Sequence, residues 1–124
     1  MRVLLDTHVL LWALAEPSKL SPSTRKQINA ADVFVSAASI WEIGIKSALG
    51  KINTSAGEIL AAIEPAGFLM LSITGEHAAK AAELPLLHKD PFDRLLVAQA
   101  AIEPMILITN DKKLEGYGSL ITLV

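Results

Sequence analysis

Four acidic residues are placed where they could act together chemically. Three follow apolar segments of the sequence and one lies at the predicted start of a helix; they are Asp6, Glu42, Asp111 and Asp93. Carboxylates that converge without matched cations repel one another, which raises their pKa values unless a cation neutralises them. Oxygen ligands in a chain without cysteine suit Mg²⁺ or Mn²⁺ better than zinc. The four acids therefore predict a divalent-cation site.

The elements that must position these acids can be predicted from the apolar pattern. Four short runs, with a possible fifth, have the composition of buried strands: residues 3–5, 33–35, 68–71, 105–108 and 120–124. Because these runs lack polar alternation, they suit a parallel sheet that is covered on both faces. Helical segments lie between them, and Gly50 and Gly67 are expected to end two of these helices. We predict one domain, residues 1–124, with an α/β fold: a three-layer α/β/α sandwich around a mainly parallel sheet of four to five strands.

This topology brings the acids together. In a parallel sheet the carboxyl ends of the strands share one edge, where open α/β folds bind ligands. Asp6, Glu42 and Asp111 are delivered to that edge by their place after strands. Asp93 joins them if its helix starts on the same side.

Helix capping explains the same acids without any chemistry. The candidates are Asp6 before a helix at 8–15, Asp111 before 112–115, Ser39 with Glu42 as a capping box, and Asp90 as an N-cap with Asp93 at the third position. Capping does not explain why Ser or Asn is scarce at these junctions. We therefore favour one shared metal site over four separate helix caps.

Composition limits the class of protein. The chain has 124 residues, no cysteine, a net charge of −2 and 52 % hydrophobic residues. The charge argues against a broad electrostatic coating of duplex DNA, which normally requires a basic face. No uncharged apolar stretch reaches the roughly 18 residues of a membrane span. We expect a soluble, non-secreted, cytoplasmic protein that does not bind membranes, whose apolar excess covers a subunit interface or a docked partner.

Several neighbours of the acids are candidates for supporting roles. Thr7 and Thr109 lie beside acids at strand ends, where their hydroxyls could orient a ligand or water or be purely structural. Lys46 follows Glu42 by four residues, which fits either an intrahelical ion pair or a phosphate contact. Arg94 could supply local positive charge for RNA or be a solvated surface charge.

The histidines and tryptophans are weaker candidates. His8, His77 and His88 could suggest metal-free acid–base cleavage of RNA, but no spacing pairs them. Trp12 and Trp41 could stack on unpaired bases. On apolar helices they are more often core or interface residues.

Four segments resemble PIN domains, specifically the VapC-type toxins of bacterial and archaeal toxin–antitoxin pairs. They are LLDTHVLLWAL, SAASIWEIGIKSALGKI, HKDPFDRLLVAQA and LITNDKKL, and the similarity runs from residue 3 to about residue 117. The resemblance implies a Mg²⁺- or Mn²⁺-dependent endoribonuclease that uses a metal-activated water and leaves a 5′-phosphate and a 3′-hydroxyl. It also implies homodimerisation and inhibition by a small cognate antitoxin, for which an exposed apolar groove is expected.

The resemblance also assigns roles to positions. Asp6, Glu42 and Asp93 match the firmest metal ligands, and Asp111 matches a fourth acid that often acts through water or at a second ion. Asp90 competes with Asp93 for the third role, and we prefer Asp93 because it aligns with the acid that opens the helix. Two other classes remain open: a non-catalytic PIN-like binding module, and a haloacid-dehalogenase-like phosphatase. The phosphatase class needs a second Asp two residues after the nucleophile, where this chain has His8.

Overall fold

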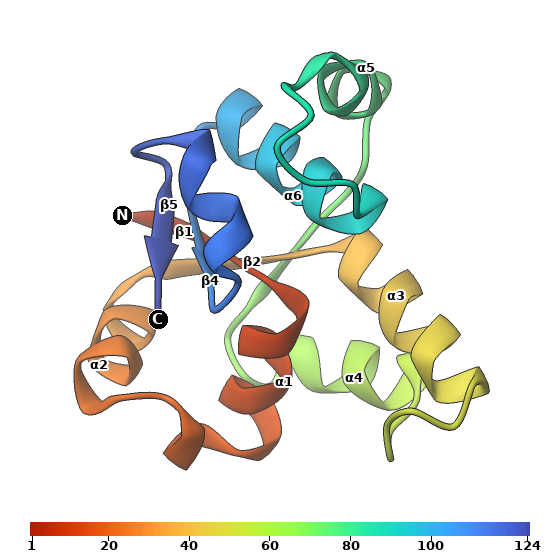
Figure 1. Ribbon diagram of the computed structural model, residues 1–124. Coiled ribbons are helices and arrows are strands. Elements are labelled where there is room, and N and C mark those ends of the chain that lie inside the picture. Colours follow the sequence, from red (N-terminus) through yellow and green to blue (C-terminus); the bar gives the residue numbers. More distant parts are fainter.

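The computed structural model describes residues 1–124, in which strands and helices alternate along most of the chain (Figure 1). The strands are β1 (Arg2–Leu5), β2 (Asp32–Ser36), β3 (Leu69–Leu71), β4 (Ile106–Thr109) and β5 (Ile121–Leu123). The α-helices are α1 (Thr7–Ala15), α2 (Pro22–Ala30), α3 (Ala37–Ala48), α4 (Ala56–Ile63), α5 (Gly75–Glu83) and α6 (Pro91–Ile102). Two short 3₁₀-helices complete the set, η1 (Pro17–Lys19) and η2 (Lys112–Tyr117).

All five strands form one parallel sheet in the order β3-β2-β1-β4-β5. Central strand β1 pairs with both neighbours, so that Leu4 lies opposite Phe34 of β2 and Leu107 of β4. The predicted parallel sheet is confirmed, and the possible fifth strand is present. The strands differ from the predicted runs by one or two residues at their ends, where strand assignment is least certain from sequence.

Helices cover both faces of the sheet, with α5 and α6 on one side and α1, α2 and α4 on the other in Figure 1. Successive residues of β1 explain this layering, because side chains alternate between the faces of a strand. Val3 and Leu5 belong to the core beneath α1 to α4, and Leu4 belongs to a second core beneath α6. The three-layer prediction is confirmed. None of the helices has the length and apolar character that crossing a bilayer requires.

The start of α3 differs from the prediction. Ser39 and Glu42 do not form a capping box, because α3 already begins at Ala37. The N-cap is Ser36, whose Oγ accepts a hydrogen bond from the backbone N–H of Ala38 at 3.0 Å. Ser39 and Glu42 therefore lie within the helix, and both side chains are buried. Both side chains face the start of α1, where they contact Thr7.

Both glycines that were expected to end helices have left-handed backbone angles. Gly50 follows α3 with φ of 72°, and Gly67 follows α4 with φ of 81°. Side chains with a Cβ rarely adopt this conformation, so glycine is the favoured residue at these two turns.

Candidate active site

The site lies where the strand order reverses. From β1 the chain builds one side of the sheet through β2 and β3, and it then returns to the other side of β1 to add β4 and β5. The carboxyl ends of β1 and β4 are adjacent, with Leu5 opposite Ile108. In open α/β sheets, the crevice outside such a reversal point is the usual place for a ligand.

A polar hollow of about 230 Å³ occupies this position. No hydrophobic residue lines it, and its lining includes all four predicted acids. The lining residues are Asp6, His8, Glu42, Lys46, His88, Asp90, Asp93, Asp111 and Lys113. The larger apolar hollows elsewhere on the surface contain none of these acids.

Asp6 follows β1 but does not cap α1 with its side chain, so the capping interpretation is wrong for this residue. Its Oδ2 instead accepts a short hydrogen bond from the Oγ1 of Thr109, at the end of β4. Burial raises the pKa of Asp6, and the nearby charge of Glu42 adds to this effect, whereas the Thr109 hydrogen bond opposes it. Asp6 is thus oriented by Thr109 in a place that disfavours an uncompensated negative charge.

Glu42 is oriented by contacts on both of its oxygens. The Oγ1 of Thr7 donates a hydrogen bond to Oε1 at 2.6 Å and lies 3.0 Å from the Oγ of Ser39. Lys46, one turn further along α3, places its Nζ 3.1 Å from Oε2. The predicted intrahelical ion pair is present, and Lys46 also lines the hollow.

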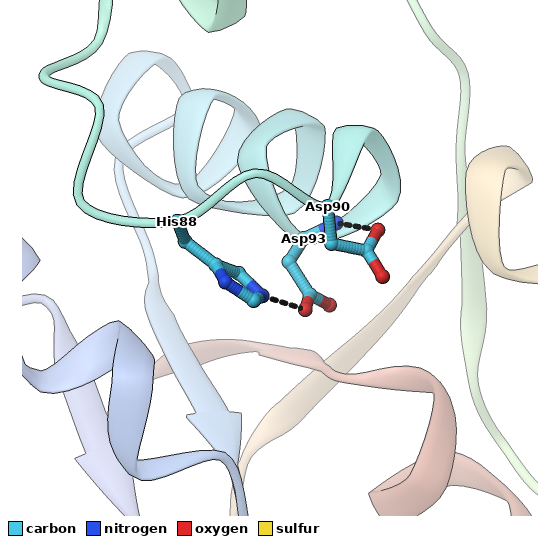
Figure 2. Close-up of side chains that lie close together, drawn as sticks. All are labelled: His88, Asp90 and Asp93. Carbon is cyan, nitrogen blue, oxygen red and sulfur yellow. Dashed lines mark hydrogen bonds and ion pairs between the residues drawn. The ribbon is translucent and has the colours of Figure 1, made fainter.

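Asp90 and Asp93 have different surroundings at the start of α6 (Figure 2). Asp90 is the N-cap, as predicted: its Oδ1 accepts hydrogen bonds from the backbone N–H groups of Phe92 and Asp93 at 2.8 and 3.3 Å. The Asp93 carboxylate is buried and lies with its Oδ2 2.7 Å from the Nε2 of His88. Capping therefore accounts for Asp90 but leaves the Asp93 side chain available to the hollow.

The pKa of Asp93 is raised to about 7. Burial is the largest cause, followed by repulsion from Asp6, and the hydrogen bond to His88 acts in the opposite direction. Asp6 follows β1 and Asp93 lies in α6, yet both line the same hollow, so the fold brings these two acids together.

Asp111 has both structural and site-facing contacts. Its Oδ1 accepts a hydrogen bond from the backbone N–H of Lys113 at 2.9 Å, which caps η2 as predicted. Its own backbone N–H donates to the Oγ1 of Thr109 at 3.0 Å. The remaining Oδ2 lies 3.5 Å from the Nε2 of His88. Thr109 thus joins Asp6 and Asp111 directly.

Arg94 is neither a solvated surface charge nor available to RNA, and both sequence interpretations are wrong. Its side chain is buried, with 9 % of the residue exposed. The guanidinium group donates to the backbone carbonyls of Ala81, Leu84 and Pro85 at 2.7 to 3.0 Å. An arginine can satisfy several carbonyls at once because its five N–H donors form a fixed fork. Arg94 therefore holds the end of α5 and the following loop.

His88 is the site residue that sequence reasoning missed. Its position five residues before Asp93 was the available signal, but a histidine in an irregular loop shows no helical or strand periodicity. The other histidines have different surroundings. His8 is exposed and lines the hollow, whereas His77 is buried and forms a hydrogen bond with Glu103 at 2.5 Å.

Trp41 is 66 % exposed and so is not a core residue; its ring packs edge-on against Phe92.

A family model described as PIN domain matches residues 3–120. The chain belongs to the PIN-domain family. A curated relative of this PIN domain is Ribonuclease VapC22 of Mycobacterium tuberculosis, which is 33 % identical over 118 residues that cover 93 % of this chain and 91 % of that protein. Membership in this family sets aside the haloacid-dehalogenase-like alternative.

Solved structures share the PIN-domain fold. VapBC2 from Rickettsia felis, bound to a DNA fragment from its promoter, matches with a TM-score of 0.72 and 14 % identity over 100 % of this chain and 98 % of that chain. A toxin–antitoxin complex from Klebsiella pneumoniae matches with a TM-score of 0.67 and 16 % identity over 97 % of this chain and 95 % of that chain. At these identities the likeness supports the fold assignment.

The residues of the hollow fit a divalent cation. Two of its carboxylic acids, Asp6 and Asp93, have raised pKa values because they are buried and lie near other acids. A cation placed among them would relieve the repulsion and favour the ionised form of both carboxylic acids. Carboxylate oxygens are the ligands that hard cations prefer. The donor set of this PIN domain therefore agrees with the predicted Mg²⁺ or Mn²⁺.

Proposed function

We propose that this protein is a Mg²⁺- or Mn²⁺-dependent endoribonuclease that acts as the toxin of a toxin–antitoxin pair. One observation carries the proposal: the four acids predicted from separate parts of the sequence all line one polar hollow at the reversal point of the sheet. Family membership and the relative named as a ribonuclease support the assignment of a nuclease. We expect it to act in the cytoplasm.

In this proposal Asp6, Glu42 and Asp93 hold the cation and Asp111 supports it. A divalent cation bound there would acidify a water that attacks phosphorus and would stabilise the negative charge that develops on the phosphate oxygens. Hydrolysis of the phosphodiester bond would leave a 5′-phosphate and a 3′-hydroxyl.

The surrounding side chains keep the acids in place. Thr109 holds one oxygen of Asp6, and Glu42 is held on both oxygens, by Thr7 and by Lys46. Lys46 places a positive charge at Glu42 where the RNA phosphate is expected. Its charge reduces the repulsion that an incoming phosphate would meet from the acids.

The test uses purified protein and labelled single-stranded or structured RNA. We expect cleavage in Mg²⁺ or Mn²⁺ and none in EDTA. Cleavage that survives chelation contradicts the metal mechanism and favours acid–base catalysis by histidines. If the folded protein cleaves no RNA under any of these conditions but binds it, the non-catalytic binding module is the correct interpretation.

Two isosteric variants separate catalysis from folding. Asp6→Asn and Asp93→Asn each remove one charge from the hollow, and each is expected to abolish cleavage. Because neither side chain caps a helix, both variants are expected to fold, which circular dichroism and thermal unfolding check. Unfolding of both variants, together with metal-independent residual activity, would instead favour a structural role for these acids.

The proposed antitoxin partner fits an apolar groove beside the acids. A hollow of about 370 Å³ lies between α3, α4 and β3; its lining residues are Ala37, Ile40, Trp41, Gly44, Ala56, Leu60 and Met70. On α3, Trp41 lines this groove and the next residue, Glu42, lines the polar hollow. A protein segment seated in the groove could therefore reach the acids, as an inhibitor of the site must.

A further inference from the structure

His88 lines the polar hollow and has no role in the proposed mechanism, although it lies beside two of the acids. Its Nε2 lies 2.7 Å from the Oδ2 of Asp93 and 3.5 Å from the Oδ2 of Asp111. These carboxylates come from different elements, Asp93 from the first turn of α6 and Asp111 from the loop after β4. The imidazole thus lies between the third and fourth acids.

The spacing of these atoms fits ligands of one ion. Ligand atoms of His88, Asp90 and Asp93 all lie within 4.8 Å of one another (Figure 2). In an octahedral site with ligands about 2.1 Å from the ion, neighbouring ligand atoms are about 3 Å apart. The two distances from His88 to Asp93 and Asp111 lie on either side of that value. The Nε2 of His88 is therefore placed where one ion could contact it together with a neighbouring carboxylate.

The fold holds His88 in this position. The loop that carries it, residues 84–90, contains no helix or strand, yet Arg94 ties it to α6 through the carbonyls of Leu84 and Pro85 at 3.0 Å each. Tyr117 adds a second tie, since its hydroxyl donates to the Pro85 carbonyl at 2.9 Å. The His88 side chain is 12 % exposed, so it faces the hollow and not solvent. These hydrogen bonds hold the loop, and with it the imidazole, beside the acids.

We infer that His88 supplies a nitrogen ligand to the divalent-cation site and biases that site toward Mn²⁺ over Mg²⁺. The inference rests on the proposed function and extends it. Mg²⁺ is bound through oxygen, whereas imidazole nitrogen is a common ligand of first-row transition metals. A mixed set of one imidazole and several carboxylates therefore favours a transition metal more than carboxylates alone do.

The direct test is pulsed electron paramagnetic resonance of the wild-type protein loaded with Mn²⁺. A directly bound imidazole gives a ¹⁴N coupling, which carboxylate ligands and water do not produce. We expect this coupling in the wild type and its loss in His88→Ala. His8→Ala is the matched control, because it removes another imidazole from the rim of the same hollow; the coupling should persist in this variant.

Calorimetric titration tests the preference for Mn²⁺ without any activity measurement. In His88→Ala the Kd for Mn²⁺ is expected to rise by roughly tenfold or more, the size of effect that loss of a group supporting a metal site produces. The Kd for Mg²⁺ should change much less. His88→Gln provides a second variant that keeps a polar side chain in the loop.

The results separate this inference from the proposed function. Mn²⁺ binding without ¹⁴N coupling, or coupling that persists in His88→Ala, overturns the role of His88 and leaves a carboxylate site intact. Tighter binding of both cations by His88→Ala also overturns it, because the imidazole then competes with the metal for Asp93 and Asp111. If the folded wild type binds neither cation, the metal-dependent function and the His88 inference both fail.

Discussion

Thr109 and Thr7 show how single hydroxyl groups organise the site. Each donates to one carboxylate oxygen, Thr109 to Asp6 and Thr7 to Glu42, and each lies next to the end of a strand. A charge-assisted hydrogen bond of this kind is stronger than a neutral one and restricts the carboxylate to one orientation. The acids are therefore positioned before any ligand arrives, as an efficient catalytic site requires.

Replacing Thr109 with valine is expected to weaken metal binding and RNA cleavage strongly and to lower the stability of the fold only slightly. Thr109→Val keeps the β-branched shape but leaves Asp6 without its hydrogen-bond donor, and the backbone N–H of Asp111 loses its acceptor. Loss of a group that orients a metal ligand typically costs 10- to 100-fold in affinity or activity. Thr109→Ser, which retains the hydroxyl, is the matched control. Equal losses in both variants would show that packing, not the hydrogen bond, matters.

The raised pKa of Asp93 predicts how the stability of the metal-free protein depends on pH. An aspartate in an unfolded chain has a pKa of about 3.9, whereas Asp93 in the fold has a pKa of about 7. Between these values the native state holds a proton that the unfolded state has released, so the free energy of unfolding falls as pH rises. For this one group the slope is at most about 1.4 kcal/mol per pH unit.

Thermal unfolding in EDTA from pH 4 to pH 8 measures this dependence. The wild type is expected to lose stability as the pH rises toward 7, and Asp93→Asn should have a flatter profile because residue 93 no longer titrates. Saturating Mn²⁺ should reduce this loss of stability in the wild type, because its positive charge offsets the charges of the carboxylates. Parallel profiles for the wild type and Asp93→Asn in EDTA would contradict the assigned pKa.

The first residues of α6 both cap the helix and contribute an acid to the hollow. Asp90 caps the helix, Pro91 occupies the first helical position, and Asp93 faces the hollow from the first turn. Proline suits the first position because its missing N–H would be unpaired there in any case. The segment therefore sets the direction of α6 and the position of its acid at once.

Asp90→Ala is expected to destabilise the protein by about 1 kcal/mol through the lost cap. Asp90→Asn removes the same charge but keeps an oxygen that can accept the hydrogen bonds from Phe92 and Asp93, so its stability should stay close to that of the wild type. Urea denaturation measures both variants. If Asp90→Asn retains stability but loses metal binding completely, Asp90 and not Asp93 is the third ligand.

Arg94 connects α6 with α5 and with the loop that bears His88. Arg94→Met keeps much of the side-chain volume but leaves the carbonyls of Ala81 and Leu84 without their Arg94 donor, whereas the Pro85 carbonyl keeps its hydrogen bond from Tyr117. We expect a loss of about 1 kcal/mol or more in stability, because a polar group left unpaired away from water costs about 1 to 3 kcal/mol when it is buried and these carbonyls are partly buried. Arg94→Lys should recover only part of it, since an ammonium group cannot reproduce the planar fork. A surface residue would show a change within about 0.5 kcal/mol.

For the whole molecule, the arrangement of surfaces predicts how a partner controls the site. The apolar groove between α3 and α4 adjoins the polar hollow, and exposed apolar areas of this kind commonly mark interaction sites. The expected exposed apolar groove is thus present. Antitoxin binding in the groove and homodimerisation remain predictions, and sedimentation of the isolated protein checks the second.

A charge within the groove should weaken binding of the cognate antitoxin. Leu60→Glu alters a half-exposed side chain of α4 that lines the groove but not the polar hollow. Leu86→Glu is the control, because Leu86 is 84 % exposed on the loop after α5 and does not line the groove. We expect a clear rise in the Kd only for Leu60→Glu, measured by calorimetry with a cognate antitoxin. Equal affinity of both variants would place the antitoxin elsewhere.

The order of the elements and the identity of the acids can be predicted from the sequence alone. Apolar runs such as residues 3–5 are long enough only for buried strands, and Gly50 and Gly67 mark helix ends through backbone conformation. These are local properties, so neighbouring residues suffice to predict them. Placement of Asp6, Glu42 and Asp111 after strands follows from the same local pattern, whereas Asp93 reaches the hollow because α6 begins on the same side of the sheet.

The contacts of each acid and its neighbours, in contrast, depend on the packing of distant segments. Whether Asp6 caps a helix or accepts from Thr109 depends on a residue 103 positions away. Arg94 is buried because α5 and the following loop present their carbonyls to it, and His88 reaches two acids because that loop is held in place. Side-chain partners distant in the chain leave no periodic trace in the sequence. They are selected by packing, which balances burial and hydrogen bonding over the whole molecule.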